Sequence, residues 1–322
     1  MHVLIMPGLT FPAPTSADIE RVRDAAGPSA RVSVVTNIDA AIALAGDVEV
    51  ILGIVPRRLF VAAPALRWVH AIASGVDMFL YPEFVTSSVI LTGEKGLVGE
   101  HLADHGFGLL LALTRKILAA QALGPEAWLH REALRHDEIE LTGSTMGIIG
   151  LGGTGRAMAR RAAAFGMRCL AVDCDQVAPS AEVVEVWSSA RLPELLGASD
   201  VLAVCCPLTP ETRGLLDAGA FAQCKPGAFL VNVTRGEVMN EDALVAALTT
   251  GRLRGAALDV APREPLPADS ALWRLPNVVM TPHTAGASQF RARRNLERFL
   301  VNLGRLADGA ALEGVVDKRR GF

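Results

Sequence analysis

The stretch that decides the fold begins at position 145 and reads Thr145-Met146-Gly147-Ile148-Ile149-Gly150-Leu151-Gly152-Gly153-Thr154-Gly155. Residues 145–149 predict a strand and residues 156–165 predict a helix. Between them, a glycine at 150 permits a tight turn, one at 152 lets the backbone approach a pyrophosphate, and one at 155 lets the helix pack on the strand. The helix start adds amide donors and a positive dipole end. The predicted phosphate loop comprises Gly150, Leu151, Gly152, Gly153, Thr154 and Gly155.

An acidic residue follows this loop at the expected spacing. The next predicted strand, 168–172, is followed by Asp173, which lies 173 − 150 = 23 residues after Gly150, close to the roughly 20 expected for an acid that binds the adenosine ribose hydroxyls. Because a carboxylate repels a 2′-phosphate, we expect NAD (NADH) rather than NADP. Asp175 is a weaker candidate for the same position, and a structural turn with an incidental acid is the alternative interpretation.

Alternating apolar runs extend this pattern to two α/β domains with parallel sheets. The other predicted strands are 3–6, 31–36, 48–54 and 68–73 in a first series, and 201–205, 229–233, 255–259 and 278–281 after the phosphate loop. A long amphipathic helix is predicted between the series, from the spacing of Leu102, Gly106, Leu109, Leu110, Leu113 and Ile117. A second follows the last strand, from Leu296, Phe299, Leu300, Leu303 and Leu306.

The second helix suggests that the chain returns to its first domain. We therefore expect two doubly wound parallel-sheet domains, with a Rossmann-type cofactor domain at 102–284. It would be inserted in a discontinuous flavodoxin-like substrate domain made of 1–101 and 285–322.

Composition and charge exclude several classes of function. With 31 basic and 34 acidic residues the net charge is −3, and no broad basic surface is expected for nucleic acid or an anionic membrane. No apolar run approaches the ~18 residues that span a bilayer, and the N-terminus lacks a signal-peptide pattern, so we expect a soluble cytoplasmic protein. The five cysteines include no C-x-x-C pair, as is typical of reduced thiols. Cys206 is a candidate catalytic thiol, although a small buried hydrophobe explains it as well.

Three segments that follow predicted strands carry the residues suited to chemistry. They read Asn232-Val233-Thr234-Arg235-Gly236, Leu258-Asp259-Val260-Ala261-Pro262-Arg263-Glu264-Pro265-Leu266-Pro267 and Thr281-Pro282-His283-Thr284-Ala285-Gly286. Ligands bind beyond the carboxyl ends of strands in open α/β sheets. We therefore expect Arg235, Glu264 and His283 to converge on one edge. Taken singly, they could instead be an arginine paired with a nearby acid, a glutamate in a surface turn and a histidine that caps a loop.

In this order along the chain, these segments resemble the D-isomer-specific 2-hydroxyacid dehydrogenase family, which includes phosphoglycerate, glyoxylate/hydroxypyruvate and formate dehydrogenases. The resemblance covers nearly the whole chain and includes Pro207-Leu208-Thr209-Pro210-Glu211-Thr212-Arg213-Gly214. It implies an oxidoreductase that interconverts a small 2-keto acid and its D-2-hydroxy acid with NADH.

The resemblance and the chemistry assign the same catalytic roles. Reducing a 2-keto acid places negative charge on the former carbonyl oxygen, so a proton donor must stand beside it, and His283 is the natural donor near neutral pH. Glu264 would hold the imidazole and favour its protonated form. Arg235 would clamp the substrate carboxylate with planar paired donors.

The resemblance also implies contacts to substrate and cofactor. The substrate loop would be Ser74-Gly75-Val76-Asp77, where consecutive amides at Gly75 and Val76 could bind a carboxylate as an anion nest. An ordinary strand-to-helix turn is the alternative. Besides the phosphate loop and Asp173, the implied cofactor contacts are Cys206, Pro207, Thr212, Val233, Thr234, Asp259, His283 and Gly286.

The chain departs from the family pattern at three positions: Gly99 and Ala261 replace a frequent alanine and aromatic residue, and Asn240 replaces an aspartate. Gly99 and Ala261 are expected near the cleft and bear on substrate size and shape rather than on reaction type. The loops at 7–14, 55–59 and 130–136 would also set specificity.

Three further interpretations concern partners and other functions. His101 and His105 would share a helix face, as metal ligands sometimes do. Because no third ligand is evident, we expect no metal there, and we expect these histidines to form hydrogen bonds between the domains instead. The resemblance implies a homodimer, with an arm at 121–137 that includes Trp128. A non-catalytic NAD-sensing module would not need the Arg235, Glu264 and His283 set, and neither would a methyltransferase on a similar fold.

Overall fold

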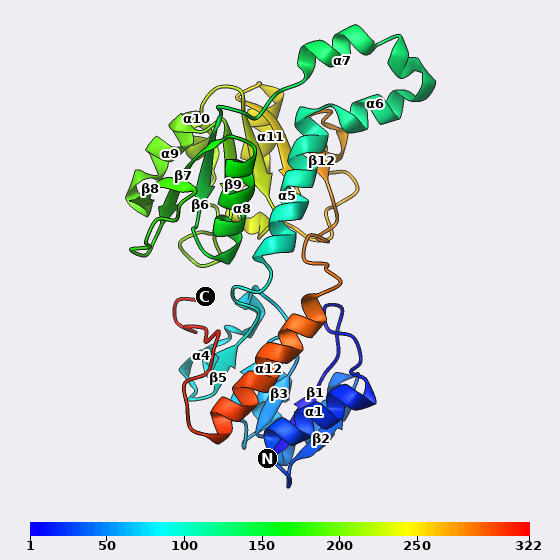
Figure 1. The fold of residues 1–322 in the computed structure, drawn as a ribbon, viewed down its shortest axis with the longest axis vertical. Helices are drawn as coiled ribbons and strands as arrows, with labels where there is room; N and C mark the ends of the chain where they lie inside the picture. Colours follow the sequence, from blue (N-terminus) through cyan, green and yellow to red (C-terminus); the bar gives the residue numbers. More distant parts are fainter. The chain divides into compact units, whose positions relative to one another are not determined.

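The computed structural model describes all 322 residues, which fold into two α/β units (Figure 1). The first unit comprises Met1–Val98 together with Ala287–Phe322, and the second comprises Gly99–Gly286. The chain leaves the first unit once and returns to it once, so the first unit is discontinuous. This arrangement confirms the expected insertion of one parallel-sheet domain into another.

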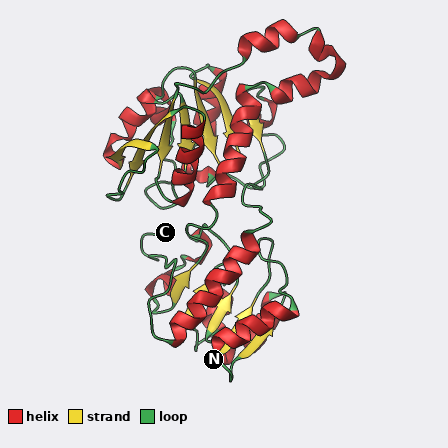
Figure 2. Cartoon of the chain, viewed as in Figure 1, coloured by secondary structure: helices red, strands yellow, loops and turns green.

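The first unit contains a five-stranded parallel sheet in the order β2-β1-β3-β4-β5, the doubly wound order of flavodoxin-like folds. Its strands are β1 (His2–Ile5), β2 (Arg31–Val34), β3 (Val50–Leu52), β4 (Trp68–His70) and β5 (Ile90–Thr92). The three central strands are fully buried because helices cover both faces of the sheet (Figure 2).

Two separate apolar cores lie on the two faces of this sheet. One includes Val22 of α1 and Phe299 of α12, and the other includes Leu59 of α3 and Phe84 of α4. The helices of the unit are α1 (Ser16–Ala26), α2 (Ile38–Leu44), η1 (Ala45–Asp47), α3 (Arg57–Ala62), η2 (Asp77–Phe79), α4 (Pro82–Thr86) and α12 (Arg291–Ala307). Thr15 starts α1 with a capping box. The predicted return helix is thus confirmed as α12.

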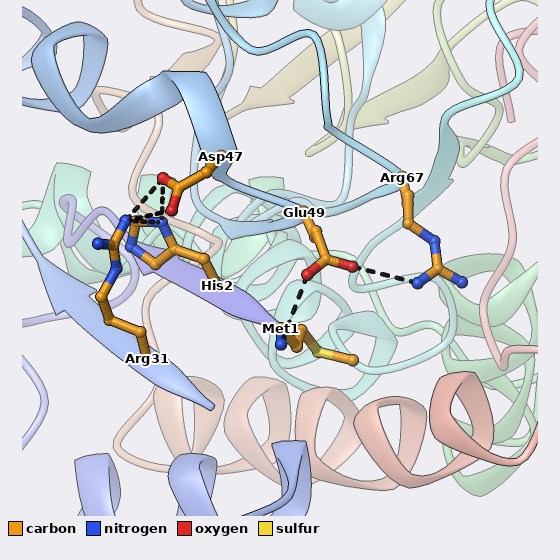
Figure 3. Close-up of polar contacts among 6 residues, drawn as sticks. All are labelled: Met1, His2, Arg31, Asp47, Glu49 and Arg67. Atoms are coloured by element: carbon orange, nitrogen blue, oxygen red, sulfur yellow. Dashed lines mark hydrogen bonds and ion pairs between the residues drawn. The ribbon is translucent and has the colours of Figure 1, made fainter. Parts of the chain in front are cut away.

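Charged contacts tie together the strand ends at the amino edge of this sheet. Figure 3 shows the residues involved: Met1, His2, Arg31, Asp47, Glu49 and Arg67. Asp47 bonds the His2 ring at 3.0 Å and the Arg31 guanidinium at 2.6 Å, and the hydrogen bond from His2 lowers the pKa of Asp47. Glu49 accepts from Arg67 at 3.3 Å. These contacts stabilise the edge of the sheet opposite the carboxyl ends of the strands. The loops at the carboxyl ends, where ligands bind in open α/β sheets, take no part in them.

The second unit contains a seven-stranded parallel sheet in the order β12-β11-β10-β9-β6-β7-β8. Its strands are β6 (Thr145–Ile149), β7 (Arg168–Asp173), β8 (Val183–Ser188), β9 (Val201–Val204), β10 (Ala228–Asn232), β11 (Leu253–Leu258) and β12 (Val278–Met280). The order reverses at β6, since β7 and β9 flank it on either side. Reversal after the first strand is typical of a Rossmann-type dinucleotide fold, in which ligands bind at that point.

Helices cover both faces of the second sheet (Figure 2). They are α5 (Gly99–Thr114), α6 (Ile117–Leu123), η3 (Gly124–Trp128), α7 (Arg131–Asp137), α8 (Gly153–Ala164), η4 (Ser189–Arg191), α9 (Leu192–Ala198), α10 (Ala218–Gln223), η5 (Gly236–Val238), α11 (Glu241–Thr249) and η6 (Ala271–Arg274). No single helix is both long and apolar enough to cross a membrane, and the one pair that passes together, α5 with residues 117–128, is bent by 57°.

Several predicted elements differ from the observed ones. The long helix was expected to continue to Ile117, but α5 ends at Thr114, Lys116 adopts φ 55°, and Ile117 starts a separate exposed helix. The helix after the phosphate loop starts at Gly153 rather than at 156. Strands β5 and β8 were not predicted: β5 has three residues, and β8 is a largely solvent-facing edge strand.

Candidate active site

The phosphate loop connects β6 to α8 at the point where the strand order reverses. Gly150 has φ 92°, and a Cβ atom at Gly155 would lie 2.1 Å from the Gly150 carbonyl oxygen. The predicted turn and the close helix–strand packing are therefore confirmed. Nothing lies within 4 Å of the space that a Cβ atom would occupy at Gly152. The predicted approach of a pyrophosphate would meet open space there.

Asp173 lies beside this loop at the end of β7. Its Oδ2 atom accepts a hydrogen bond from the Leu151 amide at 2.7 Å, and its Oδ1 atom accepts one from the Asp175 amide at 2.9 Å. A carboxylate has room for about four donors, so two protein bonds leave capacity for ribose hydroxyls. Because it accepts from the Leu151 amide, Asp173 also helps to fix the shape of the phosphate loop.

Gly99 packs against the phosphate loop. A Cβ atom at Gly99 would lie 2.5 Å from the Gly153 carbonyl oxygen and 3.1 Å from the Thr154 nitrogen. Alanine, frequent at this position in the family pattern, would therefore collide with the loop backbone in this chain. The departure was expected to bear on substrate shape, but its contacts are with the cofactor loop. Ala261, by contrast, is buried beside the candidate catalytic residues.

The segment after β9 lies against the other side of the glycine turn, since a Cβ atom at Gly150 would come within 2.8 Å of Cys206. The Thr212 hydroxyl donates to the Pro207 carbonyl at 2.7 Å and stabilises the following turn. Burial raises the pKa of the Cys206 thiol to about 12. Because the thiolate is the reactive form, Cys206 fits a wall residue and not a catalytic nucleophile.

Arg235 follows β10 in a turn that Asn232 shapes. The fully buried Asn232 donates through Nδ2 to the Arg235 carbonyl at 2.9 Å and accepts from the Thr234 amide at 3.0 Å. The Arg235 guanidinium donates to the Thr234 carbonyl at 3.0 Å. The next residue, Gly236, presses on the Ala261 backbone, since a Cβ atom there would lie 2.0 Å from the Ala261 carbonyl carbon. This contact brings the Arg235 turn against the segment that carries Glu264.

Glu264 and His283 are in direct contact. His283 Nδ1 lies 2.7 Å from Glu264 Oε2, and the Glu264 Oε1 atom accepts from the Ala261 amide at 3.0 Å. The side chains are 45% and 37% exposed for His283 and Glu264, respectively, so a small molecule could reach them. An ionised glutamate only accepts hydrogen bonds, which places a proton on Nδ1 and leaves Nε2 to exchange a proton.

Asp259 holds the loop that carries His283. The buried Asp259 carboxylate accepts from the Thr281 hydroxyl at 2.6 Å and from the Thr284 and Ala285 amides, both at 2.8 Å. The Asp259 carbonyl also accepts from the His283 amide at 2.7 Å. His283 itself has φ 55°, a conformation that costs about 1–3 kcal/mol in residues other than glycine and persists only when its surroundings enforce it.

The predicted substrate loop lies in the first unit and starts four residues after the end of β4 at His70. Ser74 is exposed, Gly75 half-buried and Val76 buried, and no backbone carbonyl accepts from the amides of Gly75 and Val76. The loop start is fixed because the Glu94 amide donates to the Ala73 carbonyl at 3.3 Å. The buried Glu94 is itself paired with Arg291 of α12.

Some relevant residues were not identified from the sequence. The sequence predicted no role for Asn232, although its amide shapes the Arg235 turn. The sequence likewise predicted no role for Thr281, whose side chain bonds both Asp259 and His105. Hydrogen bonding between domains was expected of His101 and His105, whereas the contact of His105 with Thr281 lies within one unit. A threonine next to a strand end would have been the available signal.

Comparison with known proteins agrees with this geometry. A family model described as D-isomer specific 2-hydroxyacid dehydrogenase, NAD binding domain, matches residues 107–285. A glyoxylate reductase of Korarchaeum cryptofilum is 35% identical over 293 residues, which are 89% of this chain and 85% of that protein.

Solved structures give the same result over the full length. A D-isomer specific 2-hydroxyacid dehydrogenase family protein from Aeromonas salmonicida superposes with a TM-score of 0.79 at 32% identity, covering 98% of this chain and 99% of that chain. An NADPH-dependent glyoxylate/hydroxypyruvate reductase from Sinorhizobium meliloti, in complex with NADP and sulfate, gives 0.81 at 27% identity and covers all of both chains. On its sequence and its fold, the chain belongs to the D-isomer-specific 2-hydroxyacid dehydrogenase family.

Proposed function

We propose that the protein is an NAD-dependent dehydrogenase that interconverts a small 2-keto acid and its D-2-hydroxy acid, with His283 as the acid and base. The observation that carries this proposal is the 2.7 Å contact between His283 Nδ1 and Glu264 Oε2. A histidine held by a carboxylate at one ring nitrogen, with the other available, is suited to general acid–base catalysis near neutral pH.

His283 would donate its Nε2 proton to the carbonyl oxygen of the keto acid as negative charge develops there. Glu264, acting through Nδ1, would stabilise the protonated imidazole before the transfer and orient the ring during it. In the reverse direction the neutral Nε2 would accept the hydroxyl proton. Holding the donor in place before the reaction avoids the cost of ordering it during the step.

In the second unit, Arg235 would bind the substrate carboxylate. In the first unit, the Gly75 and Val76 amides are proposed as carboxylate-binding groups. Arg235 offers planar paired donors that match a carboxylate, and its turn is fixed by the buried Asn232. No backbone carbonyl accepts from the two loop amides, which suits an anion nest. Ser74 would line the same loop.

The second unit would hold the dinucleotide. When bound, this cofactor supplies the hydride. The open backbone at Gly152 and the start of α8 fit a pyrophosphate, with Leu151, Gly153 and Thr154 beside it. The remaining proposed contacts are Cys206, Pro207 and Thr212 on the adenine side and Val233, Thr234, Asp259 and Gly286 toward the nicotinamide.

We propose NAD over NADP because Asp173 would face the adenosine ribose, where its carboxylate repels a 2′-phosphate. The Sinorhizobium meliloti relative is NADPH-dependent by its name, so cofactor choice varies among similar folds. The name of the Korarchaeum relative supports glyoxylate or a compound of similar size, such as hydroxypyruvate, as the substrate.

We also propose a homodimer formed through α6, η3 and α7. These elements have no buried residues. Trp128 at the end of η3 and Leu129, which follows it, are 79% and 83% exposed. Large exposed apolar side chains grouped together are typical of interaction surfaces. Light scattering should give twice the chain mass, and Trp128→Glu should shift the protein toward a monomer.

The test is NADH and NADPH absorbance after mixing with glyoxylate, hydroxypyruvate, pyruvate and bulkier keto acids, with a control that lacks keto acid. We expect NADH decay with at least one small keto acid and slower decay with NADPH. Binding of NADH without decay in the whole panel would instead support a non-catalytic NAD-sensing module. Faster turnover with NADPH would contradict the cofactor assignment alone.

A further inference from the structure

His105 lies in the middle of α5 and contacts the network that holds the His283 loop. Its Nε2 atom is 2.8 Å from the Thr281 hydroxyl and 3.4 Å from Asp259 Oδ1. The side chain is 25% exposed. None of the functions proposed above uses this imidazole.

The hydrogen-bond directions in this network follow from the number of protons available. The Thr281 hydroxyl has one proton, and it donates that proton to Asp259 Oδ1 at 2.6 Å. The hydroxyl oxygen must therefore accept from His105, which requires a proton on His105 Nε2. The two hydrogen bonds thus point in one direction, from the His105 N–H to the Thr281 hydroxyl and from that hydroxyl to the Asp259 carboxylate.

Asp259 transmits this contact to both sides of His283. Besides the Thr281 hydroxyl, its carboxylate accepts from the Thr284 and Ala285 amides, and its carbonyl accepts from the His283 amide. These bonds enforce the left-handed conformation of His283. A loosened Asp259 would let the loop relax away from the geometry in which His283 meets Glu264.

Helix α5, which carries His105, is held by packing in the core of the second unit. Leu109, Leu110 and Leu113 of α5 are buried in the core of the sheet. The neighbouring Asp104 accepts a hydrogen bond from Arg161 of α8 at 2.7 Å, so this contact is with α8 and not with the Asp259 network. His105 therefore connects a rigid helix to the Asp259 network.

We infer that His105 is a positioning residue for His283, which acts by donating from Nε2 to Thr281 and so fixing Asp259 and the loop at 281–285. This inference rests on the proposed role of His283 in proton transfer. It assigns no contact between His105 and the substrate or cofactor.

The test compares His105→Leu with His105→Gln, whose side-chain amide can still donate to Thr281. Losing one such hydrogen bond should lower kcat about tenfold in His105→Leu, with KM for the keto acid and Kd for NADH changed by less than about twofold. His105→Gln should recover most of kcat. In a Thr281→Val background, His105→Leu should cause no further loss, because the two residues act in one chain. Equal losses in His105→Leu and His105→Gln, additive losses with Thr281→Val, or an effect on KM alone would overturn the inference.

A second measurement does not depend on turnover. In protein with ¹⁵N-labelled histidine, NMR should show His105 protonated at Nε2, and the His283 ring signals should move in His105→Leu but stay near their original positions in His105→Gln. An unprotonated His105 Nε2 or unmoved His283 signals would contradict the inference. If the wild-type protein reduced no keto acid, the proposed function would fail, while this spectrum would still decide whether His105 positions His283.

Discussion

His283 Nδ1 and Glu264 Oε2 lie 2.7 Å apart, although 19 positions separate the residues in the sequence. Both partners are anchored from behind: the Ala261 amide donates to Glu264 Oε1, and the Asp259 carbonyl accepts from the His283 amide. The pair is thus held in place by contacts within the chain. A preformed donor of this kind is what proton transfer to a developing alkoxide requires.

Replacing His283 by alanine should remove the acid and base while leaving the phosphate loop intact. We expect kcat to fall by roughly 10²–10⁴, with little change in the Kd for NADH measured by fluorescence. Near-normal turnover would exclude His283 from the chemistry.

Glu264→Gln should have a smaller effect than His283→Ala. Glutamine can still accept from Nδ1, but it lacks the charge that stabilises the imidazolium. A hydrogen bond to a charged group is worth about 1.5–3 kcal/mol, so we expect kcat to fall about 10- to 100-fold. Steady-state kinetics on both variants would give this ranking. A Glu264→Gln loss as large as that of His283→Ala would mean that Glu264 does more than stabilise the ring.

The elements that the sequence predicted well are those in which a local pattern and its structural role coincide. Gly150 has a positive φ, and a side chain at Gly155 would collide with the Gly150 carbonyl. Both positions therefore require glycine, and their spacing predicts the loop directly. Arg235, Glu264 and His283 were placed together because each follows a parallel strand, and parallel strands end at one edge.

The remaining features depend on contacts that leave no pattern in the sequence. Asp259 holds the His283 loop partly through the backbone amides of Thr284 and Ala285, and any residue other than proline supplies such an amide. The break at Lys116 occurs without glycine or proline, and apolar residues continue past it. Strand β8 was not predicted because Glu185 interrupts its apolar residues and because it lies at the edge of the sheet, where most of its side chains are not buried.

Asp173→Asn should weaken the preference for NADH over NADPH. Asparagine can still accept from the Leu151 amide, so the loop should keep its shape, but the charge that repels a 2′-phosphate is lost. We expect the ratio of kcat/KM for NADH to that for NADPH to fall about 10- to 100-fold. Asp175→Asn is the matched control and should change the ratio much less. A larger change with Asp175→Asn would move the ribose-binding role to Asp175.

Gly99→Ala should impair cofactor binding, because the new methyl group would lie 2.5 Å from the Gly153 carbonyl oxygen. Overpacking of this kind typically costs about 1–3 kcal/mol, so we expect Kd for NADH to rise about tenfold. Gly108→Ala on the same helix is the matched control, since nothing lies within 4 Å of its Cβ position and alanine favours a helix. Similar NADH affinity in the two variants would show that the helix start shifts without disturbing the phosphate loop.

His70 should make the first unit sensitive to acid. Its side chain is fully buried, Nδ1 bonds the Thr92 hydroxyl at 2.6 Å, and Nε2 has no hydrogen-bond partner. Burial lowers the pKa of His70 to about 3, whereas a histidine in an unfolded chain has a pKa of about 6.5. As the pH falls below about 6.5, the unfolded chain binds a proton that the folded chain does not, so folding stability falls with pH.

Between pH 7.5 and 5.0 this single group should reduce the free energy of unfolding by about 2 kcal/mol. His70→Leu removes the titrating imidazole and places an apolar side chain of similar size at this buried position. Urea unfolding at the two pH values should therefore show a loss that is larger in the wild type than in His70→Leu by that amount. Since every other titrating group is shared, equal losses would mean that His70 takes up its proton as easily in the folded protein as in the unfolded chain, which its burial and its unpartnered Nε2 should prevent.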